Sequence, residues 1–220
     1  MTGAAFASPS FVAPAVWQKR SSTIPAGVTR DLRVILPDSD CGATGAGPVV
    51  TLQFALPDGR SGTAEVPAGD PIGSLARIAA EDCAGQAVSG VTALQGAALS
   101  VEGSGADSVA HLTVVSSPSG AQTAVELVRV DSTVLLESAA GGAWPLGLRI
   151  AGTDASTSFD LAIVPNRCDP HAVAEDKVGT RLPIVAIDAE GIERHFPLEL
   201  ADGIKDRLLQ YVAATCGFGG

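Results

Sequence analysis

The chain has 220 residues, of which 46% are hydrophobic and only 4% aromatic, and its formal net charge at pH 7 is −10. This length allows one large or two modest domains with cores of aliphatic side chains. The acidic balance argues against nucleic acid as a partner, because phosphate binding requires clustered Lys and Arg, and equally against anionic membrane surfaces. No stretch approaches the roughly 18 uninterrupted apolar residues that span a bilayer, so we expect no transmembrane segment.

Residues 1–15 show no hydrophobic periodicity and are expected to form a flexible N-terminal arm. We do not interpret the segment Met1–Val16 as an intact signal peptide. It lacks a positively charged start and is interrupted by Pro9 and Pro14. In this interpretation an export signal or a lipid anchor has been removed from the protein.

One plan is followed twice in the rest of the chain, over residues 31–83 and 160–216. Each copy begins with a short apolar strand that leads into a cysteine. An apolar strand, a Gly-containing turn and a more polar strand follow, and a helical segment ends the copy at a second cysteine. This internal repeat, with 25 glycines and 14 prolines between short apolar runs, favours a mainly β fold.

The two helical segments carry recognisable start and stop signals. Asp70-Pro71 predicts the start of the first helix, with Gly85 as its stop. The second helix is predicted to open near Asp202 and to stop at Gly217, because apolar residues recur at helical spacing between them. A strand is expected before the first cysteine of each copy, at Val28–Leu36 in the first.

We therefore predict two immunoglobulin-like β-sandwich units, each with a short disulfide-tethered helix: residues 16–95 with Cys41–Cys83, and residues 96–220 with Cys168–Cys216. The strands within residues 96–140 could belong to either unit. The Cys…Trp…Cys pattern of true immunoglobulin domains is not evident, so the prediction concerns architecture alone. The pairing is one of three open to four cysteines, and each bridge would stabilise by on the order of 3–4 kcal/mol. Structural disulfides indicate an oxidising, extracytoplasmic compartment.

One segment breaks the repeat and supplies a candidate metal site. Asp169-Pro170 predicts a helix start, so His171 and Glu175 would share one helix face at positions i and i+4. His195, on the returning strand, could come near. Imidazole and carboxylate groups of this kind bind hard or borderline divalent cations. The candidate ligands are Asp169, His171, Glu175 and His195, with Asp176 as an alternative carboxylate.

A structural explanation accounts for the same residues. A capped helical turn would place this His and these acids beside Lys177 and Arg181 without any metal. Enzyme signatures are missing from the sequence, which has no G-x-S-x-G elbow, no H-E-x-x-H pair, no phosphate-cradling glycine loop and no Rossmann fingerprint. We therefore expect a protein that is not an enzyme and has no cofactor beyond a divalent metal at that site.

The stretch Cys168–Arg181, read as CDPHAVAEDKVGTR, is followed by a strand and a C-terminal helix that ends in Cys216. It resembles a segment of uncharacterised secreted or cell-envelope proteins of high-GC Gram-positive bacteria. The resemblance covers Phe159–Gly217, about a quarter of the chain. It implies an exported protein that usually carries an N-terminal signal, a feature from which this chain departs, and it brings no known activity.

These observations favour an exported, non-enzymatic protein of the cell envelope that binds or spaces an unknown protein or cell-wall partner. We expect it to be secreted or attached to the envelope. Two alternatives remain: a metal-binding extracellular protein that uses the His171 and Glu175 region, and a hydrolase of unrecognised type.

Overall fold

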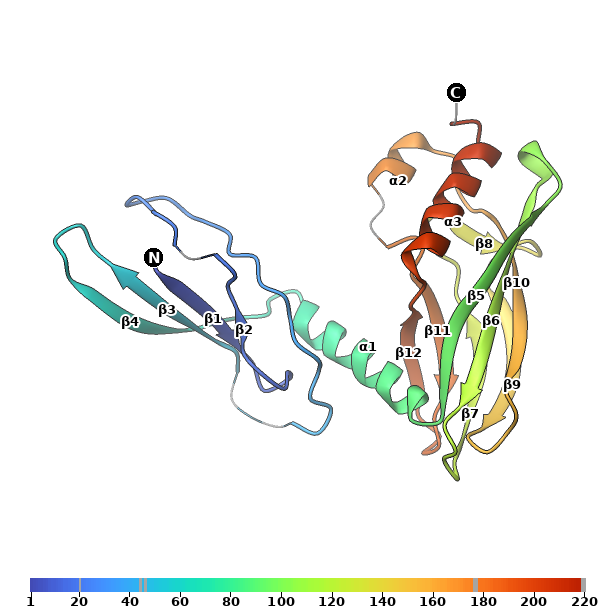
Figure 1. Cartoon of the computed structure of the whole chain (residues 1–220), viewed down its shortest axis with the longest axis horizontal. Coiled ribbons are helices and arrows are strands. Elements are labelled where there is room, and N and C mark those ends of the chain that lie inside the picture. The colour runs from blue at the N-terminus through green and yellow to red at the C-terminus, as the bar shows by residue number, and fades with distance from the viewer. Residues whose placement is uncertain (20, 44, 46, 176–177, 219–220) are drawn as a thin grey trace. The chain divides into compact units, whose positions relative to one another are not determined.

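The computed structural model describes residues 1–19, 21–43, 45, 47–175 and 178–218, except for the side chains of residues 172, 174 and 175. Strands make up 40% of it and helices 17%, which confirms the prediction of a mainly β fold. The chain divides into two compact units, Met1–Cys83 and Ala84–Gly220 (Figure 1). The division falls within helix α1 (Ser74–Ser89), whereas the expected boundary near residue 95 falls inside strand β5 (Thr92–Glu102).

The first unit contains one antiparallel sheet of four strands in the order β2-β1-β3-β4. Its strands are β1 (Gly3–Ala7), β2 (Ala15–Val16), β3 (Val49–Ala55) and β4 (Ser61–Pro67). Residues 1–15, expected to be a flexible arm, instead supply β1, which pairs with a neighbour on each side. The ordering comes from these backbone hydrogen bonds, which need no hydrophobic periodicity.

The described residues of the first unit form this single sheet and not the expected sandwich. Val28–Leu36, predicted as a strand, forms no strand in the described structure. Its side chains still alternate, since Leu32 and Val34 are half-buried while Arg33 and Ile35 are exposed. Burial of the side chains therefore alternates as it does in a strand, but the backbone of this segment is not paired in a sheet of the described structure.

Helix α1 starts three residues later and ends four residues later than predicted. The Asp70 carboxylate accepts backbone N–H groups of Ser74 at 2.8 Å, Leu75 at 2.9 Å and Ala76 at 3.2 Å. It caps the helix across a turn that ends at Gly73, whose φ of 69° suits glycine. The helix also continues through Gly85 to Ser89. A helical glycine costs about 1 kcal/mol relative to alanine, and burial of the neighbouring Ala84 and Val88 offsets that amount.

The second unit is a sandwich of two antiparallel sheets, with strand orders β5-β6-β10-β8 and β12-β11-β7-β9 (Figure 1). Its further elements are η1 (Gly105–Asp107), β6 (Val109–Pro118), β7 (Ala124–Val130), β8 (Leu136–Ser138), β9 (Trp144–Ala151), β10 (Thr157–Pro165), α2 (Pro170–Glu175), β11 (Leu182–Ile187), β12 (Glu193–Leu198) and α3 (Asp202–Thr215). Helices α2 and α3 lie at the same end of the sandwich.

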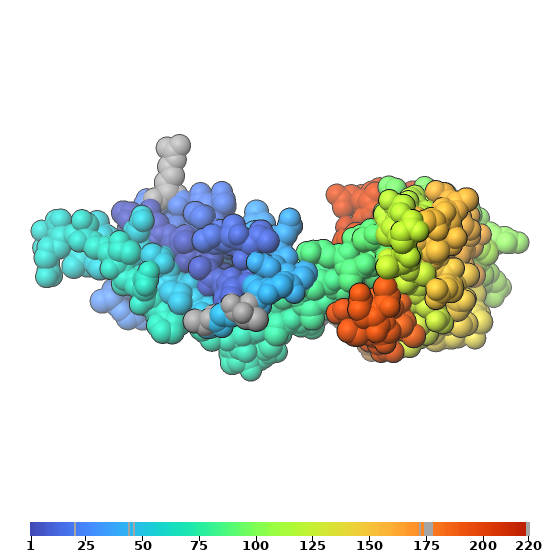
Figure 2. All heavy atoms as spheres, turned by 90° about the horizontal axis from the view of Figure 1, so that it is seen from below, coloured from blue at the N-terminus to red at the C-terminus, as the bar shows by residue number. Residues whose placement is uncertain are grey.

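One hydrophobic core fills the space between the two sheets. Alternate residues of the central strands point into it, among them Leu112 in β6, Ile163 in β10, Leu127 in β7 and Ile184 in β11, all 0% exposed. Each such side chain stabilises the unit by about 1.5–3 kcal/mol. Trp144 on β9 reaches the other sheet, where its Nε1 donates to the Ala162 carbonyl at 2.7 Å. Figure 2 shows one face of the surface of this unit, coloured from green to red.

Helix α3 covers one end of this core and confirms the predicted helix start near Asp202. It buries Leu208, Tyr211 and Val212. The Tyr211 hydroxyl donates to the carbonyls of Ser108 at 2.8 Å and Ile163 at 3.0 Å, which joins the helix to the sheet of β6 and β10.

Candidate binding site

Both disulfides tie a loop to a helix. Cys41–Cys83 joins the loop before β3 to the middle of α1, and Cys168–Cys216 joins the segment after β10 to the C-terminal residue that caps α3. This is the pairing chosen from the sequence, and it leaves no free cysteine. Two structural disulfides favour an extracytoplasmic location for the protein.

The candidate metal ligands have other partners in the structure. The Asp169 carboxylate accepts the backbone N–H of His171 at 3.0 Å and lies 3.9 Å from a guanidinium nitrogen of Arg167. His195 Nε2 lies 2.8 Å from Glu193 Oε1 on the same strand. Among the described residues no group of three or more His, Cys, Asp or Glu could hold a metal, so Asp169, His171 and His195 are not brought together.

Two residues of this hypothesis lie outside the described part of the structure. They are the side chain of Glu175 and the alternative ligand Asp176. Metal binding through them stays a prediction. For Asp169 the capped helical turn accounts for the contacts that the structure shows, because its carboxylate satisfies a backbone N–H at the start of α2.

A buried carboxylate that the sequence analysis missed, Asp188, closes the turn between β11 and β12. It accepts the backbone N–H groups of Glu190 at 3.0 Å and Ile192 at 2.8 Å, and Arg194 Nε at 2.6 Å. The Ile192 hydrogen bond lowers the pKa of Asp188 most, burial opposes it, and Arg194 lowers the pKa further. The signal was the Asp188-Ala-Glu-Gly191 turn sequence. These bonds fix the carboxylate as a structural group.

A cavity of about 430 Å³ lies in the second unit between α3, β5 and η1. Its polar groups bind one another: the hydroxyls of Ser108 and Thr215 are 2.9 Å apart, and the Arg207 guanidinium donates to the Leu99 carbonyl. Burial raises the pKa of Tyr211, which keeps its phenol neutral. The cavity therefore offers a ligand few unoccupied polar partners.

A second cavity, of about 390 Å³, lies wholly within the first unit. Trp17, which is 7% exposed, forms part of its wall. Charged side chains line it together with apolar ones, and the lining consists of Trp17, Gln18, Lys19, Ser22, Arg30, Asp31, Leu32, Arg33, Val34 and Ile35. No motif in the sequence marks this site, because its cations Lys19, Arg30 and Arg33 are spread over fifteen positions.

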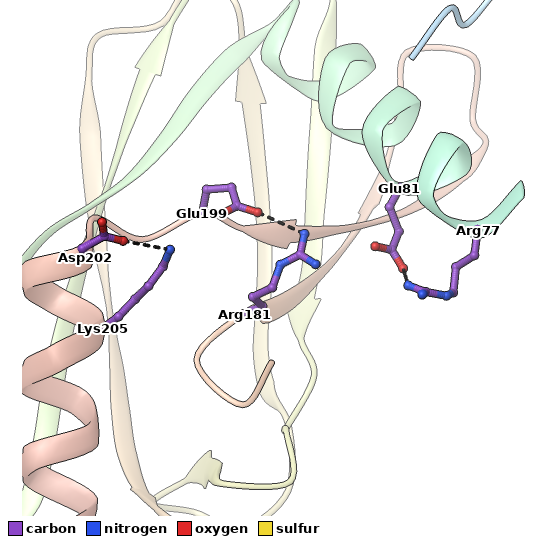
Figure 3. Close-up of polar contacts among 6 residues, drawn as sticks. All are labelled: Arg77, Glu81, Arg181, Glu199, Asp202 and Lys205. Atoms are coloured by element: carbon purple, nitrogen blue, oxygen red, sulfur yellow. Dashed lines mark hydrogen bonds and ion pairs between the residues drawn. The ribbon is translucent and has the colours of Figure 1, made fainter. Parts of the chain in front are cut away.

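The three cations in the lining of this cavity differ from most other described cations in having no acidic partner. Neither Lys19, Arg30 nor Arg33 makes an ion pair with another described residue. Most of the other described cations have an acidic partner. Figure 3 shows three such pairs, Arg77 with Glu81 at 2.8 Å, Arg181 with Glu199 at 3.1 Å, and Lys205 with Asp202 at 3.4 Å.

Several large hydrophobic side chains of the first unit are exposed. Its buried hydrophobic side chains, among those described, are Phe11, Ala15 and Trp17. In contrast, Ile72 is 86% exposed, Ile35 78% and Val12 62%. One face of the sheet carries Phe6, Val50, Leu52, Phe54 and Val66, of which none is fully buried.

No protein-family model matches the chain, and no curated protein or solved structure matches it significantly. The function therefore has to be argued from the residues of this chain. Within the described part of the chain, no helix has both the length and the apolar character needed to cross a membrane.

Proposed function

We propose that this protein is an exported, non-enzymatic binding protein of the cell envelope. In this proposal the first unit contacts the partner and the second unit is the stable support. The observation that carries it is the contrast in burial between the units. The second unit encloses a large aliphatic core, whereas the described side chains of the first unit bury few hydrophobic groups and expose several large ones.

Exposed apolar groups of this size mark interaction surfaces when they gather on one part of a protein. Ile72, Ile35 and Val12 are each more than 60% exposed on the first unit. In the second unit the most exposed large hydrophobic groups, Val178 among them, reach 55%. Among the described residues, the first unit therefore has the most exposed large hydrophobic side chains, which would lose contact with water when a partner covers them.

Export is supported by the two disulfides, since cytosolic thiols are kept reduced. The resemblance of the segment around Cys168 to envelope proteins agrees with this compartment. We assign partner binding to the first unit because the polar groups of the second-unit cavity are occupied by one another and by backbone carbonyls.

We further propose an immunoglobulin-like arrangement for the second unit. The orders β5-β6-β10 and β12-β11-β7 correspond to strands A-B-E and G-F-C of that architecture. Short β8 beside β10 and long β9 beside β7 would be the variable positions.

Co-sedimentation of the full chain with purified cell-wall and envelope fractions of a high-GC Gram-positive bacterium tests the function. We expect binding by the wild type and a loss of at least fivefold in Val12→Ser with Ile72→Ser. The matched control is Val134→Ser with Ile192→Ser, two half-exposed positions of the second unit. Equal binding by both variants, or no binding of the wild type to any fraction, would refute the proposal.

A further inference from the structure

We propose that the cavity of the first unit binds an oxyanion group carried by a small hydroxylated ligand, of which a sugar phosphate is the simplest example. The inference goes beyond the partner binding proposed above, which depends on exposed apolar side chains of the same unit. It depends on the cavity lined by Trp17, Lys19, Arg30, Asp31 and Arg33.

The excess of positive charge in the lining of this cavity favours an anionic ligand. Among the described residues, its lining includes three cations and one carboxylate, in a chain whose net charge is −10. None of Lys19, Arg30 and Arg33 is neutralised by an ion pair with a described acid. Cations that share a concave site repel one another, and a bound anion replaces this repulsion with charge-assisted hydrogen bonds.

The types of cation indicate which anion fits. A guanidinium group presents paired N–H donors that match two oxygens of a phosphate or carboxylate, and lysine adds a compact charge. Arg30 and Arg33 belong to one segment of the cavity lining and Lys19 to another, so the cations come from two parts of the chain. Such an arrangement suits a group with several oxygens better than a monovalent ion.

The size and wall of the cavity limit the rest of the ligand. Its volume of about 390 Å³ lies in the lower part of the range for small-molecule sites, roughly 300–1,000 Å³. Trp17 gives a flat aromatic wall, and the half-buried Leu32 and Val34 give apolar contact. A single ring with one charged substituent fits this space.

The carboxylate of Asp31 in the cavity lining favours a ligand that carries hydroxyl groups. A carboxylate repels a bare anion, yet it is a strong acceptor for hydroxyl donors. In a site with three cations, Asp31 is therefore suited to accept from a sugar hydroxyl while the cations hold the phosphate. This predicts preference for a hydroxylated phosphate over inorganic phosphate.

Isothermal titration calorimetry of the full chain at low ionic strength tests this with glucose 6-phosphate, inorganic phosphate and glucose. We expect glucose 6-phosphate to bind most tightly, inorganic phosphate at least fivefold more weakly, and glucose not at all. Added salt should weaken the binding of both anions. Binding of glucose as tight as that of glucose 6-phosphate would overturn the proposal, as would no binding of either anion.

Arg30→Gln with Arg33→Gln should weaken glucose 6-phosphate binding at least tenfold. The matched control, Arg60→Gln with Arg149→Gln, makes the same change in net charge away from the cavity and should change the affinity less than twofold. Circular dichroism checks that both variants fold. Equal losses in the two variants would refute the cavity as the site.

Asp31→Asn separates the role of the acid from that of the cations. This variant should bind inorganic phosphate more tightly than the wild type does, and it should lose most of the preference for glucose 6-phosphate over inorganic phosphate. An unchanged preference would contradict the role assigned to Asp31. The envelope co-sedimentation keeps the two proposals apart. Wild-type protein that binds the envelope fractions but neither phosphate would refute the ligand class alone. Wild-type protein that binds a phosphate but no envelope fraction would refute the proposed partner binding alone.

Discussion

Removal of the first-unit disulfide should unfold the first unit and leave the second folded. Cys41 and Cys83 are separated by 42 positions, and on the chain-entropy estimate closing such a loop stabilises by about 4 kcal/mol. A unit of this length commonly has roughly 4–12 kcal/mol of stability, and few described side chains of the first unit are buried. That loss equals the whole of the lower figure and a third of the upper one, and the few buried side chains place the unit near the lower figure, so Cys41→Ser with Cys83→Ser should unfold it.

The matched perturbation is Cys168→Ser with Cys216→Ser, whose closed segment spans 48 positions and whose bridge is worth about the same. The second unit has the large core, so it should stay folded at 25 °C with its Tm lowered by roughly 10–15 °C. Differential scanning calorimetry and limited proteolysis with mass mapping measure both outcomes. A single cooperative transition shifted equally in the two variants would refute the assignment of stability to two units.

Three further predictions concern single side chains. Asp188→Asn should lower the Tm at pH 7, and the gap to wild type should narrow below about pH 4 and close only below the lowered folded pKa, because such a carboxyl stabilises fully above its unfolded pKa and loses this stabilisation as the pH falls through its folded pKa; a gap that does not narrow between about pH 5 and about pH 2 in thermal melts would contradict this. Tyr211→Phe should cost about 1–2 kcal/mol in urea unfolding by removing a buried donor. The wild type should also lose stability above about pH 10 as the phenol ionises through its raised folded pKa, and a variant with the same alkaline loss would argue against Tyr211 as its source. Asp70→Ala should cost about 1 kcal/mol and speed amide exchange at the start of α1, whereas unchanged exchange there would exclude the capping role.

The elements that the sequence predicted well are those defined by local patterns. Helix α3 has apolar residues at helical spacing from Ile204 to Val212 and a glycine after its last residue, and each of these signals is local. The turn at Asp58-Gly59 likewise marks the β3–β4 hairpin, and Gly59 takes a φ of 85°. The cysteines were informative because of their placement at corresponding points of the two halves.

The features that the sequence did not predict depend on partners distant along the chain. Strand β1 has no hydrophobic period of its own and is ordered by pairing with β3, more than forty residues away. Val28–Leu36 has the period of a strand but no neighbour to pair with. The cavity of the first unit is a similar case, because Lys19 reaches Arg30 and Arg33 only through the path of the folded chain.

Helix α1 has a consequence for how the two units can be separated. Its residues up to Cys83 belong to the first unit and those from Ala84 to the second, so the boundary runs through a ladder of i to i−4 hydrogen bonds. A truncated chain that begins at Ala84 would expose the first four N–H groups of its new helix end without acceptors. A fragment of the second unit that keeps residues from Asp70 onward retains both the capping carboxylate and the complete ladder.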